Sequence, residues 1–173
     1  SPIYCDNRLT MSYPSVRKKI AESFVKKIQD LDMKPDVIAG CATAGIPHAA
    51  WLAESLNLPM IYVRSKPKEH GKGNHIEGKL NGNENVLVIE DLISTGGSSI
   101  QAAQAVQKTG AEVIGVFAIF SYGLEKAQKN FSEANLSYQT LTNFDALIEL
   151  LVEEKSISET EKEELLEWRN QLT

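Results

Sequence analysis

The chain has 173 residues, and its 42% hydrophobic and 24% charged residues are typical of a soluble globular protein with one sizeable core, so we expect a single domain over residues 1–173. Its net charge of −5 argues against broad nucleic-acid binding, and no apolar run approaches the ~20 residues of a membrane span. There is no signal-peptide pattern, and Cys5 and Cys41 form neither a metal spacing nor a disulfide framework, so we expect a cytoplasmic location. Because the first residue is Ser1 rather than methionine, we also expect that a segment before it is missing.

The first part of the chain predicts a loop, two helices and two strands. Pro14 stands at a favoured first-turn position, and apolar residues follow it at helical spacing. The predicted elements, in order, are an extended or looped segment over 1–8, a helix over 14–31, a strand over 37–39, a helix through 51–56 and a strand over 59–63.

A loop of small residues follows the first predicted strand. Residues 40–47 read Gly-Cys-Ala-Thr-Ala-Gly-Ile-Pro. Their backbone amides would meet an anion at the start of the next helix. A close-packed strand-to-helix turn explains the same residues without any ligand.

The composition changes in residues 64–79. The run RSKPKEHGKGNHIEGK holds five lysine or arginine residues against two glutamates and shows no hydrophobic period. A solvated charged loop is the plainer interpretation. Its position directly after a strand, in an acidic chain, favours a mobile basic lid over an anionic ligand.

The chain is organised around residues 86–98, VLVIEDLISTGGS. Residues 86–89 are a short apolar run, as expected of a strand buried on both faces, and Glu90 and Asp91 follow at its carboxyl end. Residues 94–98 form a small-residue loop before a helix. The loop amides suit a phosphate, whereas the carboxylates repel one and suit sugar hydroxyls or a metal held by a polyphosphate. A capped strand-to-helix turn explains the loop but not the paired carboxylates.

The last part of the chain continues the alternation of strands and helices. Thr142 is expected to cap one helix, and Ser158 with Glu161 forms a capping box for another. The elements predicted here are a strand over 111–120, a helix over 124–134, a strand over 138–141, a helix over 143–155 and a final helix to about 172. The whole pattern predicts an α/β fold with a central, mostly parallel sheet flanked by helices.

The run 86–98 resembles the phosphoribosyl-diphosphate (PRPP) binding motif of type I phosphoribosyltransferases. Together with SPIYCDNR, GIPHAAWLAESLNLP and YVRSKPKEHGKGNHIEG, it makes most of residues 1–122 similar to the orotate phosphoribosyltransferases. The resemblance implies transfer of the 5-phosphoribosyl group from PRPP to orotate, giving orotidine 5′-monophosphate and diphosphate in pyrimidine (UMP) biosynthesis. It also implies Mg²⁺ as cofactor and a homodimer whose lid loop reaches the neighbouring active site.

The same resemblance implies roles for individual residues. Lys68, His70 and Asp91 would be catalytic, with Lys68 and His70 acting on the departing diphosphate. The implied PRPP-binding residues are Arg64, Lys66, Lys68, His70, Glu90, Asp91, Leu92, Ile93, Ser94, Thr95, Gly96, Gly97 and Ser98. The metal would be held through PRPP, with Glu90 and Asp91 as its candidate protein contacts.

This chain departs from the family pattern at two places. Many members have Lys before the Gly-Ile-Pro step, where this chain has Ala44, and Asp-Arg after the fourth strand, where it reads Ser121-Tyr122. The orotate carboxylate then needs another cation, for which Arg8 is the candidate beside Ser94, with an upstream basic residue as competitor. Two rival functions stay open: a non-catalytic PRPP-binding regulator on the same fold, and a phosphoribosyltransferase for another base.

Overall fold

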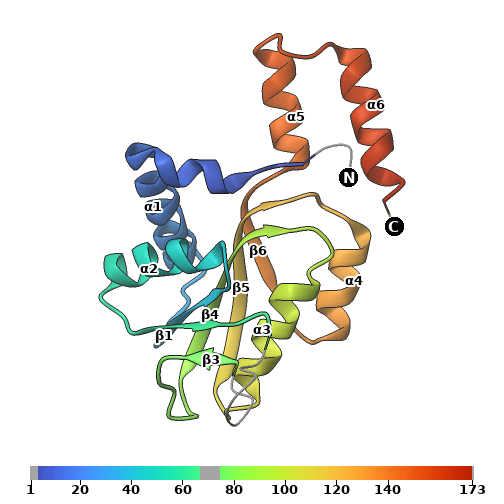
Figure 1. The fold of residues 1–173 in the computed structure, drawn as a ribbon. Helices are drawn as coiled ribbons and strands as arrows, with labels where there is room; N and C mark the ends of the chain where they lie inside the picture. Colours follow the sequence, from blue (N-terminus) through green and yellow to red (C-terminus); the bar gives the residue numbers. More distant parts are fainter. Residues whose placement is uncertain (1–3, 67–74, 173) are drawn as a thin grey trace.

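A computed structural model of the chain describes residues 4–66 and 75–172. Their strands are β1 (Val37–Cys41), β2 (Met60–Val63), β3 (Ile76–Glu77), β4 (Asn85–Ile93), β5 (Glu112–Ser121) and β6 (Tyr138–Asn143). They form one sheet in the order β3-β2-β1-β4-β5-β6, in which β3 is antiparallel to β2 and the other neighbours are parallel. The predicted mixed α/β fold with a mostly parallel sheet is confirmed (Figure 1).

Helices cover both faces of this sheet and one of its ends. They are η1 (Asn7–Ser12), α1 (Pro14–Asp30), α2 (Gly45–Leu56), α3 (Gly97–Gln107), α4 (Glu125–Glu133), α5 (Phe144–Glu153) and α6 (Glu159–Asn170). Figure 1 shows α1 and α2 on one face, α3 and α4 on the other, and the α5–α6 pair beyond one end of the strands. In the part of the chain that the structure describes, no helix has both the length and the apolar character to cross a membrane.

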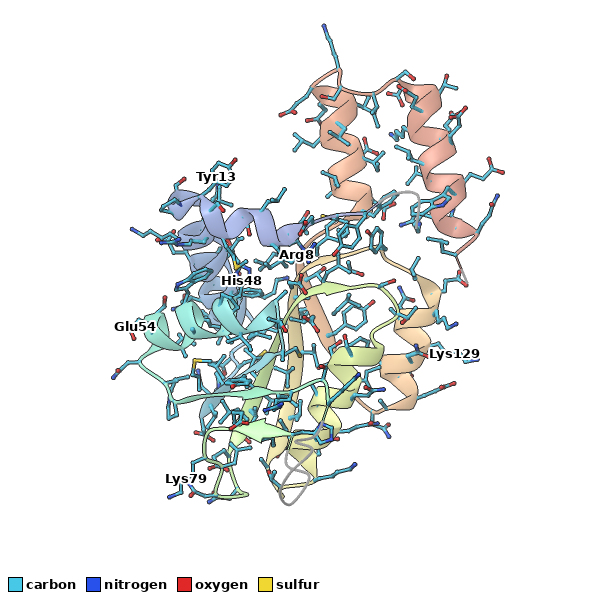
Figure 2. All side chains as sticks on the ribbon, in the orientation of Figure 1. Arg8, Tyr13, His48, Glu54, Lys79 and Lys129 are labelled. Carbon is cyan, nitrogen blue, oxygen red and sulfur yellow. The ribbon has the colours of Figure 1, made fainter. Side chains whose placement is uncertain are left out.

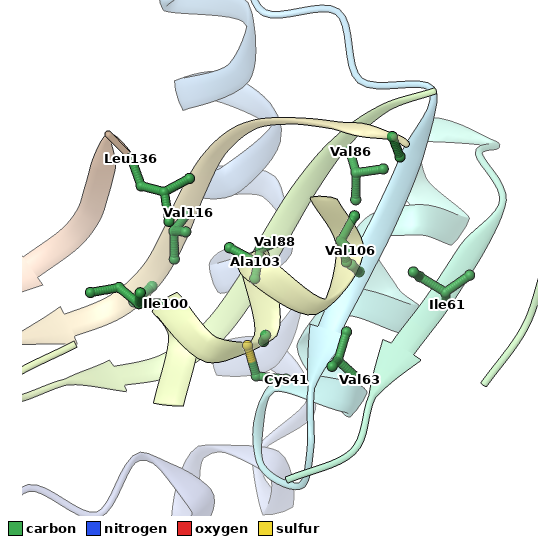
Figure 3. Packing of buried hydrophobic residues seen from close by; sticks show 14 of the residues in the cluster. Cys41, Ile61, Val63, Val86, Val88, Ile100, Ala103, Val106, Val116 and Leu136 are labelled. Atoms are coloured by element: carbon green, nitrogen blue, oxygen red, sulfur yellow. The ribbon is translucent and has the colours of Figure 1, made fainter. Parts of the chain in front are cut away.

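Two hydrophobic clusters hold these layers together. On one face, Ile100, Ala103 and Val106 of α3 pack on the valines of β4 (Figure 3). On the other face, Phe24 of α1 stacks on Phe117 of β5, with ring centroids 6.4 Å apart. The inner strands are therefore buried on both faces, which explains their near-continuous apolar runs.

A third cluster joins the α5–α6 pair to the carboxyl end of β5 through Phe120, Tyr122 and Phe144. Arg169 of α6 pairs with the Asp145 carboxylate at 2.8 and 3.0 Å and donates to the backbone carbonyl of Tyr122 at 3.0 Å. The phenol oxygen of Tyr122 accepts a hydrogen bond from the backbone N–H of Cys5 at 3.0 Å. The first described residues and the last helix thus both contact this tyrosine.

Parallel strands bring their carboxyl ends to the same edge of a sheet, and ligands bind outside that edge in open α/β folds. Here α2 begins after β1 and α3 begins after β4 at this edge. Figure 2 places Arg8 of η1 at the same end of the molecule, whereas Lys79 lies at the opposite end. A ligand site is therefore expected in the space where β1 and β4 end.

Several local expectations were wrong. Residues 7 and 8, expected to be extended or looped, begin the short helix η1, because the Asp6 carboxylate accepts from the Arg8 N–H and caps this helix. Part of the predicted lid, Ile76–Glu77, is a strand, because Ile76 is buried beside its partner Val63.

Two boundaries also differ from expectation. Strand β4 continues through Glu90 and Asp91, since pairing with β5 extends to Ile93. Asn143, rather than Thr142, caps α5, because its side-chain oxygen accepts from the Ala146 N–H at 2.9 Å. The capping box of Ser158 and Glu161 is confirmed.

Candidate active site

The two adjacent carboxylates lie at the carboxyl edge of the sheet. Glu90 is buried, with 6% of its surface exposed, and Oε1 accepts a hydrogen bond from the backbone N–H of Asp91 at 3.0 Å. Asp91 is half-buried at the same end of β4. Both residues are thus held by β4 itself rather than by a loop, which suits precise placement of a ligand.

Burial controls the ionisation of Glu90. It raises the pKa of Glu90 to about 8, and the neighbouring Asp91 carboxyl adds to the increase. Burial also raises the pKa of the Cys41 thiol, and the nearby Glu90 carboxyl raises it further. In the free protein at neutral pH, Glu90 is therefore mostly protonated and Cys41 is an un-ionised thiol.

The loop that follows β4 is built to expose backbone amides. Gly96 has a φ of +82°, and an added Cβ atom would lie 2.5 Å from Cε2 of Phe131, so only glycine fits there. The Asn130 side-chain amide donates to the Thr95 carbonyl at 2.8 Å and ties the loop to α4. No side chain caps the start of α3, so a helix N-terminus of the kind that binds anions is left without a side-chain partner.

A second loop approaches the acidic pair from β1. An added Cβ at Gly45 would lie 2.5 Å from the backbone oxygen of Ile89, so α2 begins in direct contact with β4. No side chain caps α2 either. The small-residue loop 40–47 therefore lies beside the end of β4, and the second anion site that the sequence predicts there stays a prediction.

A cavity of about 550 Å³ lies next to both loops. Its lining includes Cys41 and Ala42 of the second loop, Ser98 of the first, and Arg64 and Ser65 after β2. The structure thus places Arg64 and Ser98 on one cavity. The Arg64 guanidinium is 3.4 Å from the Glu77 carboxylate and is 40% exposed, so it can turn toward an anion at little cost.

The remaining predicted PRPP contacts differ in their surroundings. Ser94 is exposed in the loop after β4, and Lys66 is exposed next to Ser65, which lines the cavity. Leu92 and Ile93 turn their side chains into apolar clusters, so only their backbone can meet a ligand. Lys68 and His70 lie outside the described residues.

Arg8, the candidate for the orotate carboxylate, lies at the same edge and is held by a neighbour. Nε and Nη2 donate to the Asp6 carboxylate at 2.7 and 3.0 Å, and the Arg8 side chain is 55% exposed. These bonds raise the pKa of Arg8, and the charge of Asp91 makes a smaller contribution. Arg8 is therefore near the acidic pair, but its guanidinium already has an anionic partner.

Three residues at this site escaped the sequence reasoning. Asn7 donates from its side-chain amide to the Asp91 carbonyl at 3.0 Å, Asn130 is bonded to the loop after β4, and Cys41 lies against Glu90. Asn7 stands in the quoted run SPIYCDNR, but nothing in its spacing indicates a contact 84 positions away. Asn130 lies in a polar helix without any motif.

The Glu90 and Asp91 carboxylates fit a metal ion that binds together with a phosphorylated substrate. Within the described residues, no group of three or more His, Cys, Asp or Glu side chains is arranged to hold an ion. Two adjacent carboxylates with neighbouring anion sites match Mg²⁺, which keeps several waters and binds through one or two carboxylates and substrate phosphates.

Comparisons with known proteins agree with this geometry. Residues 12–148 match the family model "Phosphoribosyl transferase domain". The chain is 60% identical to an orotate phosphoribosyltransferase of Oceanobacillus iheyensis, over 99% of this chain and 85% of that protein. It is similar in structure to UMP synthase of Leishmania donovani, with a TM-score of 0.83 and 25% identity over 99% of this chain and 36% of that one. The orotate phosphoribosyltransferase of Mycobacterium tuberculosis in complex with PRPP gives a TM-score of 0.67 and 25% identity, over 81% of this chain and 80% of that one.

Proposed function

The chain belongs to the phosphoribosyl transferase domain family and, within it, to the orotate phosphoribosyltransferases, and from this premise we propose that it transfers the 5-phosphoribosyl group from PRPP to orotate. The products are orotidine 5′-monophosphate and diphosphate, and the reaction serves pyrimidine (UMP) biosynthesis. The observation that carries the proposal is the arrangement at the end of β4, where a carboxylate pair and an amide-rich loop lie side by side.

This arrangement divides a phosphorylated sugar between two kinds of contact. Glu90 and Asp91 accept hydrogen bonds from the ribose hydroxyls, because carboxylates repel phosphate and bind hydroxyls well. The amides of residues 94–98 take the 5′-phosphate at the start of α3. The cavity shared by Arg64, Ser98 and the second loop has room for the diphosphate.

Breaking the bond at the anomeric carbon creates an oxocarbenium-like sugar and a departing polyanion. Arg64, Lys66 and Lys68 stabilise the negative charge that develops on diphosphate, and His70 donates a hydrogen bond or proton to it. The glycines of the lid allow it to open for product release, and its closure keeps water from the reactive sugar.

Mg²⁺ would be held at this site through PRPP, with Glu90 and Asp91 as its candidate protein contacts. When bound, it supplies positive charge that neutralises the diphosphate. The protein contributes the orientation of both carboxylates, through β4 and the Asp91 N–H.

We infer that two copies of the chain form the active assembly, with the lid of each closing over the site of the other. Exposed apolar residues near the start of the chain support this inference: Tyr4, Leu9 and Tyr13 are each at least 60% exposed, and Val16 is 40% exposed. Side chains of this kind are enriched in the core of protein interfaces. Light scattering should give twice the chain mass, and Leu9→Lys should lower it.

The orotate side of the site needs a cation for the substrate carboxylate. The position of Arg8 near Asp91 supports this role for it, and Ser94 is exposed in the loop after β4. Binding of orotate there requires Arg8 to exchange the Asp6 carboxylate for that of the substrate. Arg8→Gln should therefore raise the KM for orotate more than the KM for PRPP.

An absorbance assay with orotate, PRPP and Mg²⁺ tests the proposed function directly. Adenine, hypoxanthine and uracil serve as control bases. Consumption of orotate alone supports the proposal, whereas turnover of another base assigns a different phosphoribosyltransferase. Binding of PRPP with no turnover of any base would instead support a non-catalytic regulator.

A further inference from the structure

Residues Cys5–Asn7 contact the carboxyl ends of two neighbouring strands. The side-chain amide of Asn7 donates to the backbone carbonyl of Asp91 on β4 at 3.0 Å. Two positions earlier, the backbone N–H of Cys5 donates to the phenol oxygen of Tyr122 after β5 at 3.0 Å. This short segment is therefore fixed to the sheet at the edge where the acidic pair lies.

Asn7 is the more constrained end of this contact. It is one of the few buried polar residues in the described part of the chain, with 8% of its surface exposed. Its side-chain oxygen accepts from the Cys5 thiol at 3.4 Å, and its backbone carbonyl accepts from the Thr10 hydroxyl at 2.5 Å. The side-chain amide of Asn7 is thus bonded to Cys5 through its oxygen and to Asp91 through its nitrogen, and the Thr10 bond fixes the backbone that carries it.

The contact determines how Asp91 is presented. The Asp91 N–H donates to Oε1 of Glu90 at 3.0 Å, and the Asp91 carbonyl accepts from Asn7. With both backbone polar groups of Asp91 engaged, the direction of its Cα–Cβ bond is restricted. The carboxylate that this bond carries is the one that the proposed function assigns to the ribose hydroxyls.

We propose that Asn7 is a positioning residue for the acidic pair, a role that rests on the proposed function. Asn7 touches neither substrate nor metal. It holds the peptide group of Asp91 so that the two carboxylates face the sugar of PRPP. The effect of losing it should therefore appear in PRPP binding more than in orotate binding.

Three variants test the proposal. Asn7→Ala removes the donor, Asn7→Asp replaces the amide by a carboxyl group of the same size, and Asn83→Asp is the matched control. Asn83 is exposed and precedes β4, at the opposite end of that strand from Asp91. Calorimetry measures the Kd for PRPP with Mg²⁺, steady-state kinetics measure both KM values and kcat, and thermal unfolding measures Tm.

Asn7→Ala should raise the Kd for PRPP about tenfold or more, because a misdirected carboxylate loses charge-assisted hydrogen bonds to the ribose hydroxyls. The KM for orotate should change less, and Asn83→Asp should match the wild type. Asn7→Asp should bind PRPP weakly at pH 8. Its PRPP affinity should recover relative to that of the wild type as the pH falls, because a protonated carboxyl group can again donate to the Asp91 carbonyl.

Two results would overturn the proposal. The first is a PRPP Kd at pH 8 equal to that of the wild type in Asn7→Ala or Asn7→Asp, even with a lower Tm, which would make Asn7 a purely structural residue. The second is an Asn7→Asp defect that stays constant with pH. If the wild type binds PRPP but does not consume orotate, the proposed function fails while this proposal is still decided by the Kd values.

Discussion

The hydroxyl group of Ser98 donates to Oε2 of Glu90 at 3.3 Å, so the first turn of α3 is bonded to the acidic pair. The sequence predicts Ser98 as a phosphate contact and Glu90 as a sugar contact. Their bond couples the two halves of the site, since a phosphate that takes the Ser98 hydroxyl removes one hydrogen bond from Glu90. Loss of this donor favours the protonated form of Glu90, whereas hydroxyl donors and a cation from the ligand favour the ionised form, so ligand binding and the ionisation of Glu90 should be linked.

We expect PRPP with Mg²⁺ to release protons when it binds at pH 7. Burial raises the pKa of Glu90 to about 8 in the free protein, whereas hydroxyl donors and a cation favour the ionised carboxylate. Calorimetry in two buffers of different ionisation enthalpy measures this release. Glu90→Gln has no proton to lose, and the idea is wrong if that variant releases as many protons as the wild type.

The contribution of Glu90 to the stability of the ligand-free protein should fall as the pH rises. The Glu90 carboxyl has a pKa raised from 4.5 to about 8 by folding, so it stabilises the folded state fully below pH 4.5, and that stabilisation is lost progressively toward pH 8. Glu90→Gln should therefore gain stability relative to the wild type between pH 5 and 8. The gain is on the order of a few kcal/mol at most, since one pKa unit corresponds to about 1.4 kcal/mol.

Urea unfolding at several pH values measures this difference. Glu112→Gln is the control, because Glu112 is exposed at the amino end of β5. A difference between wild type and Glu90→Gln that stays the same from pH 5 to pH 8 would refute the expected linkage.

Lys68→Ala should lose about 10²–10³-fold in kcat, as for removal of one donor from a comparable oxyanion site. Its thermal unfolding should match that of the wild type. Lys129→Ala is the matched control, because Lys129 is an exposed lysine of α4 (Figure 2), outside the predicted lid. Equal turnover in the two variants would remove Lys68 from the mechanism.

Gly45→Ala should destabilise the protein by about 1–3 kcal/mol, the usual cost of forcing extra atoms into a packed site. Its Cβ atom would lie 2.5 Å from the Ile89 carbonyl oxygen, so α2 must move away from β4. Gly97→Ala is the control for stability, because the nearest atom to its added Cβ is Oγ1 of Thr95 at 4.0 Å. Chemical denaturation compares the two, and equal stabilities would show that the Gly45 contact relaxes freely.

Much of the fold was predictable because its signals are local. Alternating helical and apolar runs predicted most of the helices and inner strands, and the Ser158–Glu161 box was found where expected. The end of β4 was not predictable, because its pairing with β5 through Ile93 depends on a strand nineteen or more positions away. The strand Ile76–Glu77 was hidden for a similar reason, since its burial beside Val63 is a tertiary effect.

The site shows the same division. The order of residues 86–98 alone predicted the acidic pair and the small-residue loop that follows it. The contact of Asn7 with Asp91 and that of Asn130 with Thr95 join segments that are distant in sequence, and asparagine side chains carry no periodic signal. Cys41 looked like a small residue in a loop, and only folding places it against Glu90.

The double attachment at Tyr122 has a practical consequence for handling the enzyme. The phenol oxygen of Tyr122 accepts a hydrogen bond from Cys5, and its backbone carbonyl accepts one from Arg169. A bulky tag joined close to Cys5 or Arg169 would therefore disturb the position of Tyr122, which follows the carboxyl end of β5. The exposed turn around Asn81 and Asn83, at the far end of β4, is the better place for a dye or a surface linker.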